Sequence, residues 1–278
     1  MSTLSGLISA GGGSTSFPVI FLSKSQTFVP PQDGNVCIHV IGAGGSGSAS
    51  RLTTEAGGGG AGGYCRLNSL AVTTSSSFTV VIGAGHVPTS GHSAGGNGGA
   101  STVAGTGLGS TLTANGGTGH PKNTTANSAT GGGASNGNVN NTGGAGSAKY
   151  GGGAVGITGT GNQGYVDIST SGPTWLGFGG ACDVLGDLWS SSLGQIAGGL
   201  PGKGIHSNLS LLDTASANAG PLSGGGTVQA TGQYTYHAGG AAIIGGGGGG
   251  CVHSQGNPGF GAIGGRGGDG IVIFQYIP

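Results

Sequence analysis

The motif with the clearest chemical meaning is a glycine fingerprint at Gly42, Gly44 and Gly47, directly after the apolar run 35–41. A G-x-G-x-x-G that follows a strand and opens a helix is typical of dinucleotide binding, because the helix N-terminus receives the pyrophosphate. Here no helical apolar period follows, and a run of four glycines comes at 57–60. The residues Ile-Gly-Ala-Gly also recur at 82–85. We interpret the motif as a strand that runs into a glycine helix, and we predict no bound cofactor.

Acid, base and nucleophile candidates are few. His206 and Asp213 lie near serines, but no Gly-x-Ser-x-Gly elbow surrounds them. Asp183 and Asp187 are four residues apart, and a retaining glycosidase needs two carboxyl groups about 5 Å apart in a cleft. A solvated loop pair or a turn cap is the favoured interpretation. Metal binding by these two residues or Asp167 has as little support. We predict no catalytic residue, no metal ligand and no enzymatic activity.

The candidates for ligand contact are aromatic. The segment from 157 to about 237 has less glycine than its surroundings and carries both tryptophans of the chain. Aromatic rings beside amide and hydroxyl groups suit the binding of sugars or of flat, partly apolar surfaces. A second small core or a subunit interface would use the same residues, so both interpretations stay open. The candidate contacts, for a receptor or another ligand of this kind, are Trp175, Phe178, Trp189, Tyr234 and Tyr236.

The four cysteines, Cys37, Cys65, Cys182 and Cys251, are widely spaced and form no C-x-x-C pair. The spacing therefore gives no support for zinc. Cys37 and Cys65 both lie in expected strands and could be neighbours in a sheet. We favour small buried hydrophobic side chains over a disulfide, and the pairing stays open.

Composition excludes several classes of protein. Glycine occupies 73 of 278 positions without a collagen period, and there are only ten prolines. Seven basic and seven acidic residues balance, with no basic stripe for nucleic acid. No apolar run approaches the roughly 18 residues of a membrane span. The first residues have neither the basic nor the apolar region of a secretory signal, so we expect synthesis in a cytoplasm. Disorder is the alternative, but the Val/Ile/Phe runs argue against it.

Six apolar runs have the character of strands. In the run 35–41, Val36, Ile38 and Val40 alternate with Cys37 and His39, which predicts a half-buried strand. Runs at both ends of the chain suggest one β-sandwich whose first and last strands share a sheet, with the glycine tracts as long insertions that leave one end of it. The expected strands lie within 17–22, 26–30, 35–41, 64–72, 77–82 and 269–277.

The glycine tracts need a special conformation. Each glycine costs roughly 0.5–1 kcal/mol relative to alanine in regular structure, so a folded chain must use what only glycine permits. Polyproline II has three residues per turn and no internal hydrogen bonds, and bare helices of this form can bond side by side as a polyglycine II bundle. Gly→Val within 57–60 should then abolish folding, whereas Gly→Ala in an outer loop should not. The structural glycines are Gly57, Gly58, Gly59, Gly60, Gly151, Gly152, Gly153, Gly245, Gly246 and Gly247.

An ordered set of motifs resembles a known family. Val-Cys-Ile-His-Val-Ile-Gly-Ala-Gly-Gly at 36–45, Phe-Thr-Val-Val-Ile-Gly-Ala-Gly at 78–85 and Gly-Asp-Gly-Ile-Val-Ile-Phe at 268–274 look like the glycine-rich domain of tailed-bacteriophage tail-fibre and adhesin proteins. The resemblance covers about 26–276. It implies an all-β fold with polyglycine II helices, residues 1–16 as an attachment arm to other virion proteins, and 17–278 as one glycine-rich domain. The aromatic segment, about 157–238, is longer than the usual pattern and would be an insertion.

The resemblance implies a virion protein assembled in the host cytoplasm, and we expect a homotrimer. The favoured function is a tail-fibre tip that binds a bacterial surface glycan or an outer-membrane protein. A structural fibre or decoration protein without a receptor, such as a head fibre or tail ornament, is the alternative, and a capsule depolymerase is a lesser one. An ice-binding protein is disfavoured because short regular repeats are missing.

Overall fold

The computed structural model describes residues 17–50, 56–88, 93–121, 129–146, 152–157, 159–161, 165–167, 176–178, 205–207, 222–225, 228–230, 237–253 and 262–278. These residues form strands and extended tracts without any helix, and two antiparallel sheets have five strands each. No helix within these ranges is long and apolar enough to cross a membrane. The all-β prediction is confirmed.

The first sheet joins the two ends of the described chain. Its strand order is β1 (Val19–Leu22), β18 (Ile271–Ile277), β3 (Gly34–Ile41), β5 (Tyr64–Val72) and β10 (Val139–Asn141). β18 lies between β1 and β3 and pairs with both in antiparallel register. The prediction that the first and last strands share a sheet is therefore confirmed.

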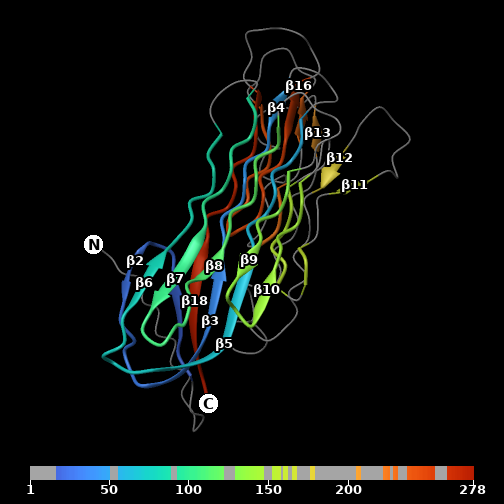
Figure 1. The fold of residues 1–278 in the computed structure, drawn as a ribbon. Helices are drawn as coiled ribbons and strands as arrows, with labels where there is room; N and C mark the ends of the chain where they lie inside the picture. The colour runs from blue at the N-terminus through green and yellow to red at the C-terminus, as the bar shows by residue number, and fades with distance from the viewer. Residues whose placement is uncertain are drawn as a thin grey trace, which may run out of the picture.

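The second sheet faces the first and completes the sandwich (Figure 1). Its order is β2 (Gln26–Phe28), β6 (Phe78–Val81), β7 (Ser101–Gly105), β8 (Leu112–Ala114) and β9 (Ala134–Ser135). The ring of Phe274 packs between the sheets, with its centroid 4.4 Å from that of Phe28 and 5.4 Å from that of Phe78. The inward residues of β3 are those that alternation predicts: Val36, Ile38 and Val40.

The other face of β3 corrects the sequence prediction. Cys37 and His39 were expected on an open face, but their relative exposures are 8% and 2%. A second apolar cluster accounts for part of this burial, because Ile41 and Tyr64 on this face pack with Val155 and Leu222, which come from later segments. Alternation along one strand shows which residues share a face, but it does not show that a distant segment covers that face.

Beyond β3 the chain continues as the extended tract 42–49, whose hydrogen bonds repeat every three residues. Amides 42, 45 and 48 donate to the carbonyls of 63, 60 and 57, and amides 43, 46 and 49 donate to those of 99, 96 and 93. Amides 44 and 47 donate to 268 and 265. Three donor directions with a three-residue period are the geometry of a polyproline II helix. The predicted polyglycine II packing is present.

The same three-residue hydrogen-bond repeat arranges the tracts in a hexagonal array. Tract 42–49 also accepts hydrogen bonds from residues 86, 117, 120, 248 and 251, so it has a hydrogen-bonded partner tract on every side. Tracts 56–63 and 245–250 are enclosed in the same way. The hydrogen bonds define four rows of tracts. The first row consists of 93–100, 115–121 and 129–133, and the second of 83–88, 42–49, 56–63 and 142–146. The third row consists of 264–269, 245–250 and 152–156, and the fourth of 239–242 and 222–225.

The tracts alternate in direction, as the antiparallel bonds between 42–48 and 57–63 show. Tracts 42–49, 83–88, 115–121, 142–146, 222–225 and 245–250 run away from the sandwich, and each is followed by a returning tract (Figure 1). We call the end of the bundle remote from the sandwich the distal end. Three outgoing tracts lead there into a parallel sheet, whose order is β13 (Ile205–Ser207), β14 (Val228–Ala230), β16 (Cys251–His253) and β4 (Ala49–Ser50). The smaller sheets pair β11 (Tyr165–Asp167) with β12 (Leu176–Phe178), and β15 (His237–Ala238) with β17 (Ala262–Ile263).

Candidate functional site

The glycines of the fingerprint lie inside the bundle. A Cβ on Gly44 would fall within contact distance of the Gly246 carbonyl, and a Cβ on Gly47 would meet that of Gly249. Gly42 faces the carbonyls of residues 114 and 115 in the same way. Because protein main chain fills the space beside these glycines, a phosphate has no room there. This geometry agrees with our interpretation of the motif as the start of a glycine helix.

Similar approaches are made by six of the glycines singled out in the sequence: Gly59, Gly60, Gly152, Gly153, Gly246 and Gly247. A Cβ on Gly60 would lie 2.5 Å from the carbonyl carbon of Thr130 and closer still to its oxygen. Gly152 and Gly247 meet the carbonyls of residues 247 and 59. Gly59 and Gly153 face main-chain oxygens too, whereas Gly151 lies outside the described residues. Glycine is therefore required at those positions where a Cβ would overlap the main chain of the next tract.

Two serine–histidine pairs link tracts of the bundle, and the sequence analysis did not single them out. The Ser46 hydroxyl accepts a hydrogen bond from the Gly96 amide at 3.0 Å and lies 2.8 Å from His86 Nδ1. The Ser48 hydroxyl accepts from the Gly57 amide at 3.1 Å and lies 3.0 Å from His120 Nδ1. Both serines are fully buried, so neither is placed to attack a substrate. Each hydroxyl accepts a hydrogen bond from a main-chain amide, and a glycine in place of the serine could not make this bond.

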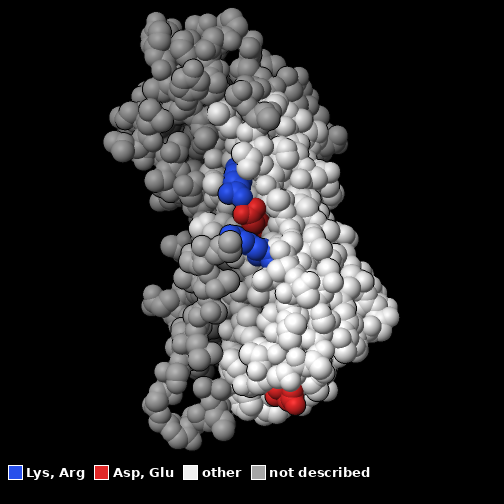
Figure 2. Space-filling view, turned by 90° about the vertical axis from the view of Figure 1, so that its left-hand side faces the viewer, with Lys and Arg blue, Asp and Glu red and all other residues white. Residues whose placement is uncertain are grey.

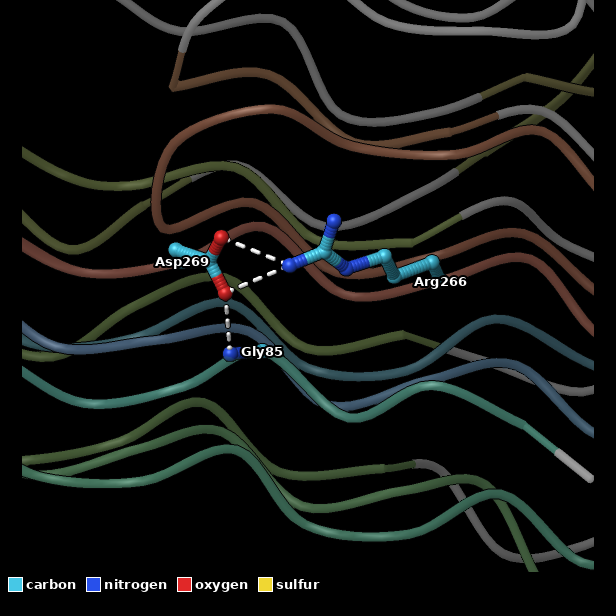
Figure 3. Close-up of polar contacts among 3 residues, drawn as sticks. All are labelled: Gly85, Arg266 and Asp269. Atoms are coloured by element: carbon cyan, nitrogen blue, oxygen red, sulfur yellow. Dashed lines mark hydrogen bonds and ion pairs between the residues drawn. The ribbon is translucent and has the colours of Figure 1, made fainter.

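A clamp of three residues joins two rows near the sandwich. Asp269 accepts hydrogen bonds from Arg266 Nη2 at 2.7 and 2.6 Å, one on each carboxylate oxygen (Figure 3). Oδ1 of the same carboxylate accepts from the Gly85 amide at 2.8 Å. Both charged side chains are nearly half exposed, so solvent screens the ion pair. The Asp-Gly-Ile-Val motif thus carries a side chain that ties tract 264–269 to tract 83–88.

A buried polar cluster lies on the outer face of the first sheet. The Tyr64 hydroxyl donates to His39 Nδ1 at 2.7 Å, and His39 Nε2 lies 3.3 Å from both Gln275 Oε1 and Cys37 Sγ. Burial lowers the pKa of His39 to about 4, assisted by the nearby charge of Arg66 and opposed by the Gln275 bond. His39 is therefore neutral at physiological pH, and its two ring nitrogens hold strands β5 and β18 together.

The thiols in the described part of the chain are poor nucleophiles. Burial raises the pKa of Cys37 and of Cys65 to about 11, and that of Cys251 to about 12. Since the thiolate is the reactive form, none of the three is activated. All three are buried, which agrees with the interpretation as small buried side chains, whereas Cys182 lies outside the described residues. Cys65 pairs in register with Val40 rather than with Cys37. No group of three His, Cys, Asp or Glu side chains gathers among the described residues as a metal site would require.

Comparison with known families assigns the chain to one of them. The sequence model of a glycine-rich domain family matches residues 22–277, which is nearly the whole chain. The chain belongs to this glycine-rich domain family. A search of curated proteins finds no match to it. The family assignment agrees with the resemblance seen in the sequence at the level of the glycine-rich domain.

One face of this glycine-rich domain carries little charge. On the face drawn in Figure 2, the described surface is uncharged apart from one small group of basic and acidic residues and an acidic spot near one end. The outward positions of tract 93–100 are exposed and have small side chains, Ala94, Asn97 and Ala100, spaced three residues apart. Small neutral side chains therefore cover the array along this tract.

Four of the five aromatic candidates lie outside the described residues: Trp175, Trp189, Tyr234 and Tyr236. Phe178 ends β12 and is the register partner of Tyr165 in β11. β12 lies against β13 and β14, so the structure brings the backbone of one candidate to the parallel sheet at the distal end. The sequence offered no signal for this sheet, because its strands are short and come from distant segments.

The distal end is the candidate functional site of this glycine-rich domain. Outgoing tracts reach it at Ser50, Pro88, Pro121, Gly146 and His253, and the chain returns from there to the sandwich. Outgoing tracts therefore end, and their returning tracts begin, at this one end of the bundle. Binding residues are often found where a rigid scaffold presents chain connections.

Proposed function

We propose that this glycine-rich domain is the receptor-binding part of a bacteriophage tail fibre or adhesin. The observation that carries the proposal is the shared direction of the outgoing tracts, which all end at the distal end of the bundle. β1 and β18, which hold both ends of the described chain, lie at the opposite end. A rod that is held at one end and presents the other end to its surroundings suits the recognition of a cell surface.

The bundle supports this role physically. Main-chain hydrogen bonds of 2.6–3.4 Å join the tracts in every direction across the array, and each is worth about 1 kcal/mol net. A scaffold with bonds in two dimensions resists bending more than a single hairpin does. Preorganised ends lower the entropy that the connecting segments lose on binding.

In this proposal the sandwich end faces the virion, with residues 1–16 as the arm to another virion protein, and assembly as a homotrimer stays an expectation. The receptor is a bacterial surface glycan or an outer-membrane protein. A fibre or decoration protein without a receptor has the same scaffold, so binding has to be measured directly.

The test is adsorption. Purified protein added to the host bacterium should reduce adsorption of virions that carry this chain, and heat-denatured protein should not. Virions that lack the chain should adsorb at least tenfold more slowly than complete virions. Normal adsorption of such virions would refute the receptor-binding role and would favour the structural fibre.

A further inference from the structure

The parallel sheet at the distal end gathers polar residues from four distant segments. His206 in β13 pairs in register with Gln229 in β14, and the same register row continues through β16 to Ser50 in β4. The next row holds Ser207 and His253, two strands apart. Since parallel strands share a direction, these residues occupy the carboxyl ends of the strands. Ligands of open α/β sheets bind at the same ends of the strands.

An aromatic hairpin lies beside this polar edge. Tyr165 and Phe178 are register partners in β11 and β12, and directly opposite residues in an antiparallel pair occupy one face of it. β12 lies against both β13 and β14. The topology therefore places an aromatic pair next to the strands that carry His206 and Gln229.

The residue types at this edge select a class of ligand. Sugar hydroxyls hydrogen-bond to amide, imidazole and hydroxyl groups, and the C–H faces of a pyranose pack on aromatic rings. Asp167 is the single charged residue on β4, β11, β12, β13, β14 and β16. Its negative charge disfavours anionic sugars, and these strands contain no lysine or arginine to attract them.

We propose that the edge formed by β11–β14 and β16 binds a neutral saccharide unit of the bacterial surface, with Phe178, His206 and Gln229 as contacts. This inference rests on the receptor-binding function and specifies its ligand as a glycan rather than an outer-membrane protein. A neutral hexose offers the hydroxyl pairs and the apolar face that these residues match.

The experiment uses the full chain on an array of bacterial oligosaccharides, in which neutral hexose units stand beside matched units that carry uronic acid or phosphate. Phe178→Ala and Gln229→Ala are the test variants, with Phe178→Tyr to retain the ring. The control is Thr79→Ala, an exposed position on β6 in the sandwich. Circular dichroism and urea unfolding check that each variant is folded.

We expect binding to neutral units, at least a tenfold loss of affinity for Gln229→Ala and Phe178→Ala, and no loss for Phe178→Tyr or the control. A preference for the anionic units, or equal affinity in folded variants, would overturn the saccharide proposal. If no saccharide binds but the protein still blocks virion adsorption, the glycan inference fails and the adhesin function stands, with an outer-membrane protein as the receptor. If adsorption is not blocked either, the receptor-binding function itself fails.

Discussion

A single added methyl group inside the bundle tests the packing most directly. In Gly60→Ala, the new Cβ would lie 2.5 Å from the carbonyl carbon of Thr130 and 3.0 Å from the amide nitrogen of Gly131. Both atoms belong to the main chain of tract 129–133, so no side-chain rotation relieves the overlap. Tract 129–133 has to move away from tract 56–63.

The magnitude follows from the bonds that hold tract 129–133 in place. Its displacement stretches the bond from the Gly132 amide to the Ala61 carbonyl, 2.8 Å, and the bond from the Thr118 amide to the Thr130 carbonyl, 2.9 Å. Losing the first bond leaves its groups buried and costs about 1–3 kcal/mol, whereas the second bond lies at the surface, where a hydrogen bond is worth about 0.5–1.5 kcal/mol. The smaller conformational entropy of the unfolded alanine variant offsets about 0.4–1 kcal/mol of this loss. Gly60→Ala should therefore lower the free energy of unfolding by roughly 1–4 kcal/mol, and Gly60→Val should abolish folding.

Urea unfolding followed by circular dichroism measures this loss as a lower midpoint at an unchanged slope. The matched controls are Gly133→Ala, in the same tract as the clash, and Gly109→Ala, in the turn after β7. A Cβ at either position meets nothing within 4 Å, so both variants should be as stable as the parent or more stable by about 0.4–1 kcal/mol. If Gly60→Ala unfolds at the same urea concentration as Gly133→Ala, the close-packing argument is wrong.

Three further predictions rest on side chains. His39 is neutral when folded, with its pKa lowered to about 4 from 6.5. As the pH is lowered from 6.5 to 4, the unfolded chain binds a proton at this histidine but the folded chain does not. The free energy of unfolding should therefore fall over this range, by up to about 3 kcal/mol. His39→Gln should flatten that slope in pH-dependent urea unfolding, and an unchanged slope would exclude His39 as its source. Asp269→Ala should cost about 1 kcal/mol, because it removes the exposed Arg266 pair and the Gly85 bond. Asp269→Asn should cost less in the same assay, and equal costs would mean that the Gly85 bond contributes nothing. The buried thiols of Cys37, Cys65 and Cys251 should react with a thiol reagent at pH 8 only after unfolding. Fast reaction of these thiols in the native protein would contradict their burial.

The sandwich could be predicted from the sequence because its strands carry their own patterns. The run 64–72 is β5 to the residue, and the inward alternation of Val36, Ile38 and Val40 is the one observed. The opposite face of β3 was predicted to be open, and this was wrong because Val155 and Leu222 come back over the sheet. Such long-range cover has no local pattern in the sequence.

The backbone conformation of the glycine tracts could be predicted from the sequence, but which tracts lie beside one another could not. Glycine clusters indicate polyglycine II, yet nothing near Gly44 reveals that its neighbours are residues 246 and 268. Buried serines also obscure the pattern, since Ser46 and Ser48 stand inside the array by making hydrogen bonds. At the distal end, the sequence indicated aromatic residues as candidates, whereas the register that brings Gln229 beside His206 depends on the three-dimensional path of the chain.

The three-residue hydrogen-bond repeat of tract 42–49 restricts how this protein can evolve. One or two extra residues within a tract would turn every later position by about 120° or 240° about its axis, which would carry bonded amides away from their acceptors. Three extra residues restore the angle and only lengthen the rod by one turn. Insertions and deletions should therefore accumulate freely in the distal connections, whereas within the array they should come in multiples of three residues, which preserve the direction of every amide.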